Sequence, residues 1–203
     1  MSHDEWHAAP NPCQAAARVG TLDAALRGME AALDAGFSHL KINAVLIGGF
    51  NDDEIPALAG LTRRYPTDVR FIELMPMTEN EAFGAHAYVS GDAVLQALPE
   101  LAETEQDDGV AKLYRLPGAQ GNIGLIRAVS RHFCAARNRI RLTSDGKLKP
   151  CLHSNAEYPI KGLDEDGMRR VMREVILAKP ACHDPLSALE RSRAGRGMNE
   201  IGG

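Results

Sequence analysis

Residues 133–152 read FCAARNRIRLTSDGKLKPCL, and this stretch predicts a β-hairpin. Ile140 and Leu142 alternate with arginines, which is the period-two pattern of a strand with one basic face. The Ser-Asp-Gly step at 144–146 has turn chemistry, because glycine tolerates positive φ and aspartate can bond its own backbone. The alternation resumes at 147–149, so the chain is expected to return as a second, antiparallel strand.

The same hairpin concentrates residues that carry chemistry. Cys134 precedes its first strand and Cys151 ends its second, so the two thiols are expected to be neighbours. Arg137, Arg139 and Arg141 are spaced by two and are expected to point the same way. Thiols beside guanidinium groups suggest soft-metal binding next to an anion site. The alternative is a solvated basic strand face beside two reduced thiols.

Composition excludes several classes of function. The chain has 203 residues and a net charge of −4, so no overall basic excess favours nucleic acid. An apolar fraction of 44% supports a packed core. There is neither a run of 18 apolar residues nor a signal-peptide pattern, and the cysteines are not tightly paired. We therefore expect a cytoplasmic protein with no membrane segment.

The first half predicts alternating helices and strands. Residues 1–18 are polar and mixed, and we expect a poorly ordered lead-in. Helices are expected at Thr21–Ala35 and at 53–64, the second with a capping box formed by Asn51 and Glu54. Strands are expected at 40–47, where near-continuous apolar residues predict cover on both faces, and at 69–74. This order is typical of parallel α/β units.

The second half predicts fewer regular elements. A helix is expected at 90–98, strands at 111–116 and 123–129, then the hairpin, and a helix from Asp164 or Asp166 to Leu177. Cys182 and His183 could begin a zinc site, but no second pair has the required spacing. The fold class is α/β. The expected domains are the lead-in 1–18, a partial βα barrel at 19–109, and an α+β C-terminal domain at 110–203.

The hairpin resembles the second cluster motif of the GTP 3',8-cyclases of molybdenum cofactor synthesis, which are radical S-adenosylmethionine enzymes. Their motif runs F-C-x-x-C-N-R-x-R-L-T, then a glycine turn, then a third cysteine followed by leucine. The matching residues are Phe133, Cys134, Asn138, Arg139, Arg141, Leu142, Thr143, Gly146, Cys151 and Leu152. One position departs, because Arg137 stands where the family has its middle cysteine.

Further segments extend the resemblance to both sides of the hairpin. The segments LKIN, RFIELMPM and the final M-x-x-I-G-G also match the family. From the residues alone, Lys41 is an edge lysine, Met75 fills a core, and the tail is disordered. The resemblance instead implies a GTP contact for Lys41, an S-adenosylmethionine contact for Met75, and a GTP site lined by Arg139, Ile140 and Arg141. It also implies that Gly202 and Gly203 reach the active site.

The resemblance implies an activity that this sequence is not expected to perform alone. The family converts GTP to (8S)-3',8-cyclo-7,8-dihydroguanosine 5'-triphosphate with two 4Fe–4S clusters and S-adenosylmethionine, and it forms homodimers. No C-x-x-x-C-x-x-C segment for the radical-forming cluster occurs here, and the first family segment begins near Gly20. We therefore assign no catalytic residue.

The second cluster is also expected to be weakened. Cys134 and Cys151 remain as metal ligands, whereas the guanidinium of Arg137 stays protonated and cannot replace a thiolate. Three hypotheses remain: a degenerate relative of the cyclase, a GTP-binding pseudoenzyme, or a split subunit that needs a separate N-terminal half.

Overall fold

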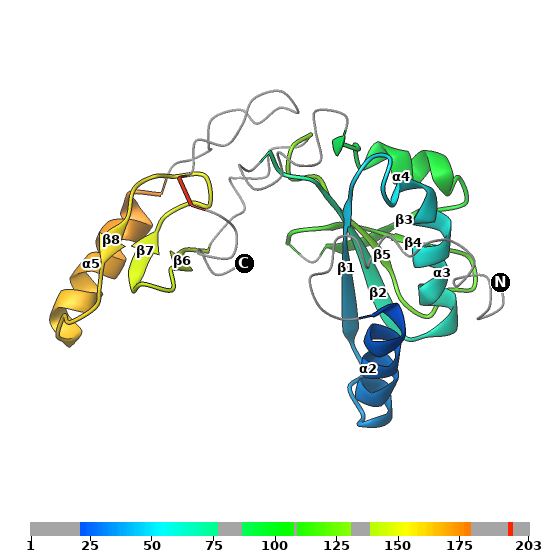
Figure 1. Ribbon diagram of the computed structural model, residues 1–203, viewed down its shortest axis with the longest axis horizontal. Helices are drawn as coiled ribbons and strands as arrows, with labels where there is room; N and C mark the ends of the chain where they lie inside the picture. Colours follow the sequence, from blue (N-terminus) through cyan, green and yellow to red (C-terminus); the bar gives the residue numbers. More distant parts are fainter. Residues whose placement is uncertain (1–20, 77–86, 108, 131–138, 180–194, 197–203) are drawn as a thin grey trace. The chain divides into compact units, whose positions relative to one another are not determined.

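The computed structural model describes residues 21–76, 87–107, 109–130, 139–179 and 195–196, which fall into two compact units. Unit 1 takes the described residues up to Phe71 together with 92–125. Unit 2 takes the described residues of 72–91 and of 126–203. Each unit has its own sheet (Figure 1). The domain boundaries expected from the sequence remain predictions.

A five-stranded sheet in the order β1-β2-β5-β4-β3 forms the centre of unit 1 (Figure 1). Pairing of β3 with β4 and of β4 with β5 is antiparallel. The neighbours β1 and β2 are joined through a helix, a connection that suits parallel strands. The sheet is therefore mixed, and the expectation of purely parallel units holds only for its first part. The strands are β1 (Leu40–Leu46), β2 (Thr67–Glu73), β3 (Ala102–Asp107), β4 (Lys112–Arg115) and β5 (Ile123–Ile126).

Three helices accompany this sheet: α2 (Leu22–Asp34), α3 (Ile55–Arg64) and α4 (Asp92–Ala97). The start of α2 is as expected, since the Thr21 hydroxyl accepts a hydrogen bond from the Ala24 amide at 3.2 Å. The predicted capping box is wrong. The Asn51 side chain instead bonds the backbone of Val45 and Ile47, and a 3₁₀ turn, η2 (Asp52–Glu54), leads into α3.

Strand β1 differs from the prediction of a strand covered on both faces. Its residues alternate between half-buried and exposed, and only Leu46 at its end is buried. Val45 is 39% exposed, and Lys41 is exposed on the same face. Alternate residues of β1 are exposed because β1 lies at the edge of the sheet, whereas β2 lies between β1 and β5. An apolar run could not distinguish the two situations.

The core of unit 1 lies between the sheet and α3. Alternate residues of β2 are buried, and Val69 and Phe71 are at most 1% exposed. On α3, Ile55, Ala59 and Thr62 recur at helical spacing and are buried as well. The unpredicted strand β3 lies at the other edge of the sheet. Its sequence, AETEQD, is polar enough to resemble a loop.

Unit 2 contains the predicted hairpin in a three-stranded antiparallel sheet. Strands β6 (Arg141–Leu142) and β7 (Lys147–Lys149) pair, and the unpredicted β8 (Tyr158–Pro159) joins β7. Gly146 has φ +82°, which confirms the turn. Helix α5 (Glu165–Leu177) runs beside β7 and β8 (Figure 1). The Asp164 side chain caps it by accepting a hydrogen bond from the Gly167 amide at 2.8 Å.

Two expectations about architecture have different outcomes. The mixed α/β character is confirmed, whereas the partial barrel remains a prediction. Within the described ranges, no helix is both long and apolar enough to cross a membrane. The predicted tail and the segment around Cys182 and His183 lie outside the described residues.

Candidate functional site

Two cations face each other across the hairpin. Arg141 on β6 is the direct partner of Lys149 on β7 in the antiparallel register. Residues directly opposite share a face, and like charges there destabilise a sheet unless an anion lies between or beside them. Arg139 and Ile140 precede β6, the first exposed and the second half-buried. The predicted R-x-R segment is thus placed at the start of the hairpin.

Lys149 is the most deeply buried charge of this hairpin. Its side chain is 1% exposed, and its Nζ lies 3.9 Å from Glu157 Oε1. Burial lowers the pKa of Lys149, and the negative charge of Glu157 partly opposes that shift. Cys151 follows two residues later as a half-buried free thiol. The hairpin therefore places the buried charge of Lys149 two residues before Cys151, one of the two predicted metal ligands.

A second group of charges surrounds the hairpin turn. Arg196 donates from Nη2 to Asp145 Oδ2 and to Glu157 Oε2, both at 2.8 Å, and from Nε to Glu157 Oε1. Lys147 Nζ lies 3.1 Å from Asp145 Oδ2 and 3.0 Å from Glu157 Oε2. Thr143 completes the turn by donating to Asp145 Oδ1 at 2.6 Å. We call these four charged residues, Asp145, Lys147, Glu157 and Arg196, the turn cluster.

The turn cluster predicts a pH dependence. The Arg196 guanidinium lowers the pKa of Glu157 to about 2 and holds the pKa of Asp145 well below its usual value. A depressed carboxyl pKa stabilises the folded state above the unfolded pKa, and that stabilisation is lost as pH falls. We expect the cluster to be unchanged from about pH 5 to pH 8 and to weaken only below about pH 4. Titration of the Glu157 side-chain carbon by NMR checks this, and a midpoint near 4.5 would contradict it.

Glu73 is a functional candidate that the sequence did not indicate. It ends β2, is 1% exposed, and its carboxylate accepts four hydrogen bonds. Oε1 accepts from the Gly91 amide at 2.9 Å and from the Ser130 hydroxyl at 2.5 Å. Oε2 accepts from the amides of Val129 and Ser130 at 2.8 and 2.7 Å. One carboxylate therefore fixes the residues that follow β5 and those that precede α4.

The signal for Glu73 was present but ambiguous. A glutamate inside the strand pattern RFIELMP would be read as solvent-facing, since buried glutamates are rare unless their oxygens are satisfied. Only the fold shows the backbone amides that satisfy this one. Tyr88 lies in the same environment, where burial and the Glu73 charge raise the pKa of its hydroxyl.

The other predicted site residues are distributed unevenly. Lys41 lies on the exposed face of β1 in unit 1, and Met75 follows β2 in unit 2 and is half-buried. Cys134, Arg137, Gly202 and Gly203 lie outside the described residues. Of the predicted residues, Arg139, Ile140, Arg141 and Cys151 are therefore the ones brought together in a single described hairpin.

The described donor set does not fit an iron–sulfur cluster by itself. Within the described ranges, no three His, Cys, Asp or Glu side chains are grouped as metal ligands. Cys151 contributes one thiol, whereas such clusters are held mainly by several thiolates. Lys149, two residues before Cys151 on the hairpin, is a cation. We therefore derive no chemical step through a cluster on these residues.

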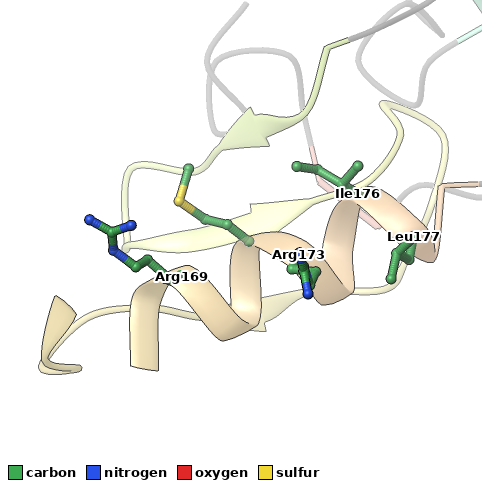
Figure 2. Close-up of a pocket in the computed structure, with 5 residues that line it drawn as sticks. Arg169, Arg173, Ile176 and Leu177 are labelled. Atoms are coloured by element: carbon green, nitrogen blue, oxygen red, sulfur yellow. The ribbon is translucent and has the colours of Figure 1, made fainter. Parts of the chain in front are cut away.

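A surface pocket of about 500 Å³ lies along α5, and none of the hairpin residues discussed above lines it. Figure 2 shows Arg169 and Leu177 at opposite ends of the lining residues, with Arg173 and Ile176 between them. Arg169 is already paired with Glu165 at 2.6 Å, one helical turn away. The pocket contains none of the predicted site residues, so it provides a control surface for tests of the hairpin.

Comparison with known proteins decides the family. Residues 67–185 match the family model described as Molybdenum Cofactor Synthesis C. This range includes β2, Glu73, the hairpin and α5. The chain belongs to the Molybdenum Cofactor Synthesis C family.

Relatives of this Molybdenum Cofactor Synthesis C protein are named GTP 3',8-cyclase. The protein from Alkaliphilus oremlandii is 42% identical over 200 residues, covering 96% of this chain and 62% of the relative. The protein from Heliobacterium modesticaldum is 38% identical over 205 residues, with the same two coverages. The chain thus spans about three fifths of the length of the curated relatives that it matches. The resemblance inferred from the hairpin motif is confirmed.

Proposed function

We propose that this chain is the C-terminal part of a GTP 3',8-cyclase and that its hairpin binds the nucleotide. The observation that carries the proposal is the register pair of Arg141 and Lys149, two cations placed directly opposite each other. Glu157 already lies 3.9 Å from the buried Lys149 Nζ, and a triphosphate beside Arg141 would add a further counter-charge. Arginine can bond phosphate oxygens in a bidentate manner. The names of the relatives supply GTP as the nucleotide.

The proposed roles follow the family motif residue by residue. Arg139, Ile140 and Arg141 line the GTP site, and the family motif assigns a GTP contact to Lys41. Met75 lines an S-adenosylmethionine pocket, and Gly202 and Gly203 end the tail that reaches the site. Cys134 and Cys151 are the thiols available to iron. A 4Fe–4S cluster of the family's kind would need a third thiolate, and Arg137 stands in the place of that cysteine.

Calorimetry with GTP tests the nucleotide site. We expect saturable heat with the 203-residue chain. The double variant R139A/R141A is expected to weaken binding on the order of 100-fold, because each charged hydrogen bond contributes about 1.5–3 kcal/mol. The matched control is R169A/R173A, which removes the same charge from the α5 pocket and should leave the affinity unchanged. Absence of heat at millimolar GTP, or equal losses in both variants, would exclude this function for the hairpin.

We propose that cyclisation of GTP requires a radical-forming segment of the C-x-x-x-C-x-x-C type, which these 203 residues do not contain. The relatives named GTP 3',8-cyclase are longer than the region that this chain matches, which supports the requirement. We expect iron-reconstituted chain alone to form no cyclised product from GTP. Product formation is expected only when a polypeptide that carries a C-x-x-x-C-x-x-C segment is co-expressed. Formation of product by the isolated chain would refute this requirement.

A further inference from the structure

The C-terminal segment is attached to the hairpin sheet at a defined point. Arg196 bonds both oxygens of Glu157 and one oxygen of Asp145, which lie 39 and 51 residues earlier in the chain. The neighbouring amide of Gly195 donates to Asn155 Oδ1 at 2.9 Å. These contacts join the β6–β7 turn, the residue before β8, and the C-terminal segment. One arginine thus joins three parts of the chain. This is unusual, because exposed ion pairs of surface arginines generally contribute little to stability.

Arg196 makes more contacts with the carboxylates than a single ammonium group makes. The fork of the guanidinium reaches two carboxylates at once, and its side chain is only 20% exposed. Lys147 also contacts both carboxylates, and Lys149 lies 3.9 Å from Glu157 Oε1, so three cations surround the two negative charges. Thr143 further fixes Asp145 by a hydrogen bond. Lys147 and Thr143 therefore also hold these acceptors, which reduces the entropic cost of their contact with Arg196.

We propose that Arg196 is a positioning residue that clamps the C-terminal segment to the turn of the β6–β7 hairpin and thereby fixes the strands that carry Arg141 and Lys149. This role rests on the proposed function for what the hairpin binds. The clamp itself is a property of the described fold. Its loss frees residues 195–196 and loosens the turn, while unit 1 keeps its structure.

Trypsin provides a direct test, because it cleaves after Arg196 only when that side chain leaves its carboxylates. The readout is the release of the peptide 197–203 by mass spectrometry. We expect slow release from the wild type and a rise of about tenfold or more in D145N/E157Q, which keeps Arg196 in the sequence. The control E165Q removes the partner of Arg169 and should not change release at Arg196. Equal release from wild type and D145N/E157Q would overturn the clamp.

Affinity for GTP separates positioning from direct contact. If Arg196 acts by positioning, R196A and D145N/E157Q should both weaken GTP binding, by about three- to tenfold. If Arg196 contacted GTP itself, D145N/E157Q would tighten binding because two negative charges are removed, and the proposal would fail. Unchanged affinity in both variants would also contradict it. Should the wild type bind no GTP, the proposed function fails, while trypsin release still decides the clamp.

Discussion

Replacing Gly121 by alanine is expected to unfold unit 1 or to lower its stability severely. A Cβ at Gly121 would lie 2.0 Å from the carbonyl oxygen and 2.5 Å from the carbonyl carbon of Thr67. Both are backbone atoms at the start of β2, and Thr67 is 1% exposed, so neither side can give way without moving the strand. Overpacking generally costs about 1–3 kcal/mol. We expect at least the upper end of that range.

The matched control for this clash is Gly60→Ala. Gly60 lies inside α3, and a Cβ there would meet nothing within 4 Å. Alanine is favoured over glycine inside a helix by about 0.5–1 kcal/mol, so this variant should be slightly more stable than wild type. Denaturant unfolding followed by circular dichroism measures both variants. Similar denaturation midpoints for the two variants would contradict the close approach of Gly121 to the backbone of β2.

Replacing Glu73 by glutamine is expected to have the second largest effect. Glutamine keeps the size of the side chain but places an NH₂ group where a carboxylate oxygen now accepts hydrogen bonds. If the NH₂ group replaces Oε1, it faces the Gly91 amide, while the Ser130 hydroxyl can turn and accept from it; if it replaces Oε2, it faces the amides of Val129 and Ser130. An unsatisfied buried donor costs about 1–3 kcal/mol, at least one is created, and the remaining hydrogen bonds lose their charged acceptor. We expect a loss on the order of 3 kcal/mol.

Hydrogen exchange locates that loss. In the glutamine variant the amides of Gly91, Val129 and Ser130 should exchange faster, whereas amides of the β4–β5 ladder should change much less. Ser130→Ala removes one of the four hydrogen bonds and should cost only about 1 kcal/mol. If E73Q retains wild-type stability and protection at these amides, the carboxylate does not organise the segments after β2 and β5.

The hairpin was predictable because its signals are local. Alternation around Ile140 and Leu142, with a glycine turn between the strands, determines both pairing and register within a few residues. The helices α2 and α5 were predictable for the same reason, since their caps, Thr21 and Asp164, lie next to periodic apolar residues. Local chemistry therefore identified the elements that carry the candidate site.

The remaining features depend on contacts between distant residues. The edge position of β1 depends on which strands pair, and no residue of β1 itself encodes it. The burial of Glu73 depends on amides that lie 18 to 57 residues later in the chain. Arg196 could be read as part of a polar tail until its carboxylate partners were placed beside it. Sequence patterns predict such residues poorly. The burial of the charged group and the hydrogen bonds that offset the cost of that burial both depend on tertiary contacts.

Amide chemical shifts of the isotope-labelled chain, followed during titration with GTP, test the central proposal most directly. If the retained hairpin is the nucleotide site, the largest shift changes should fall at residues 139–151, which include Arg141, Lys149 and Cys151. Shift changes confined to residues 169–177 of the α5 pocket, or no saturable change at millimolar GTP, would contradict the account.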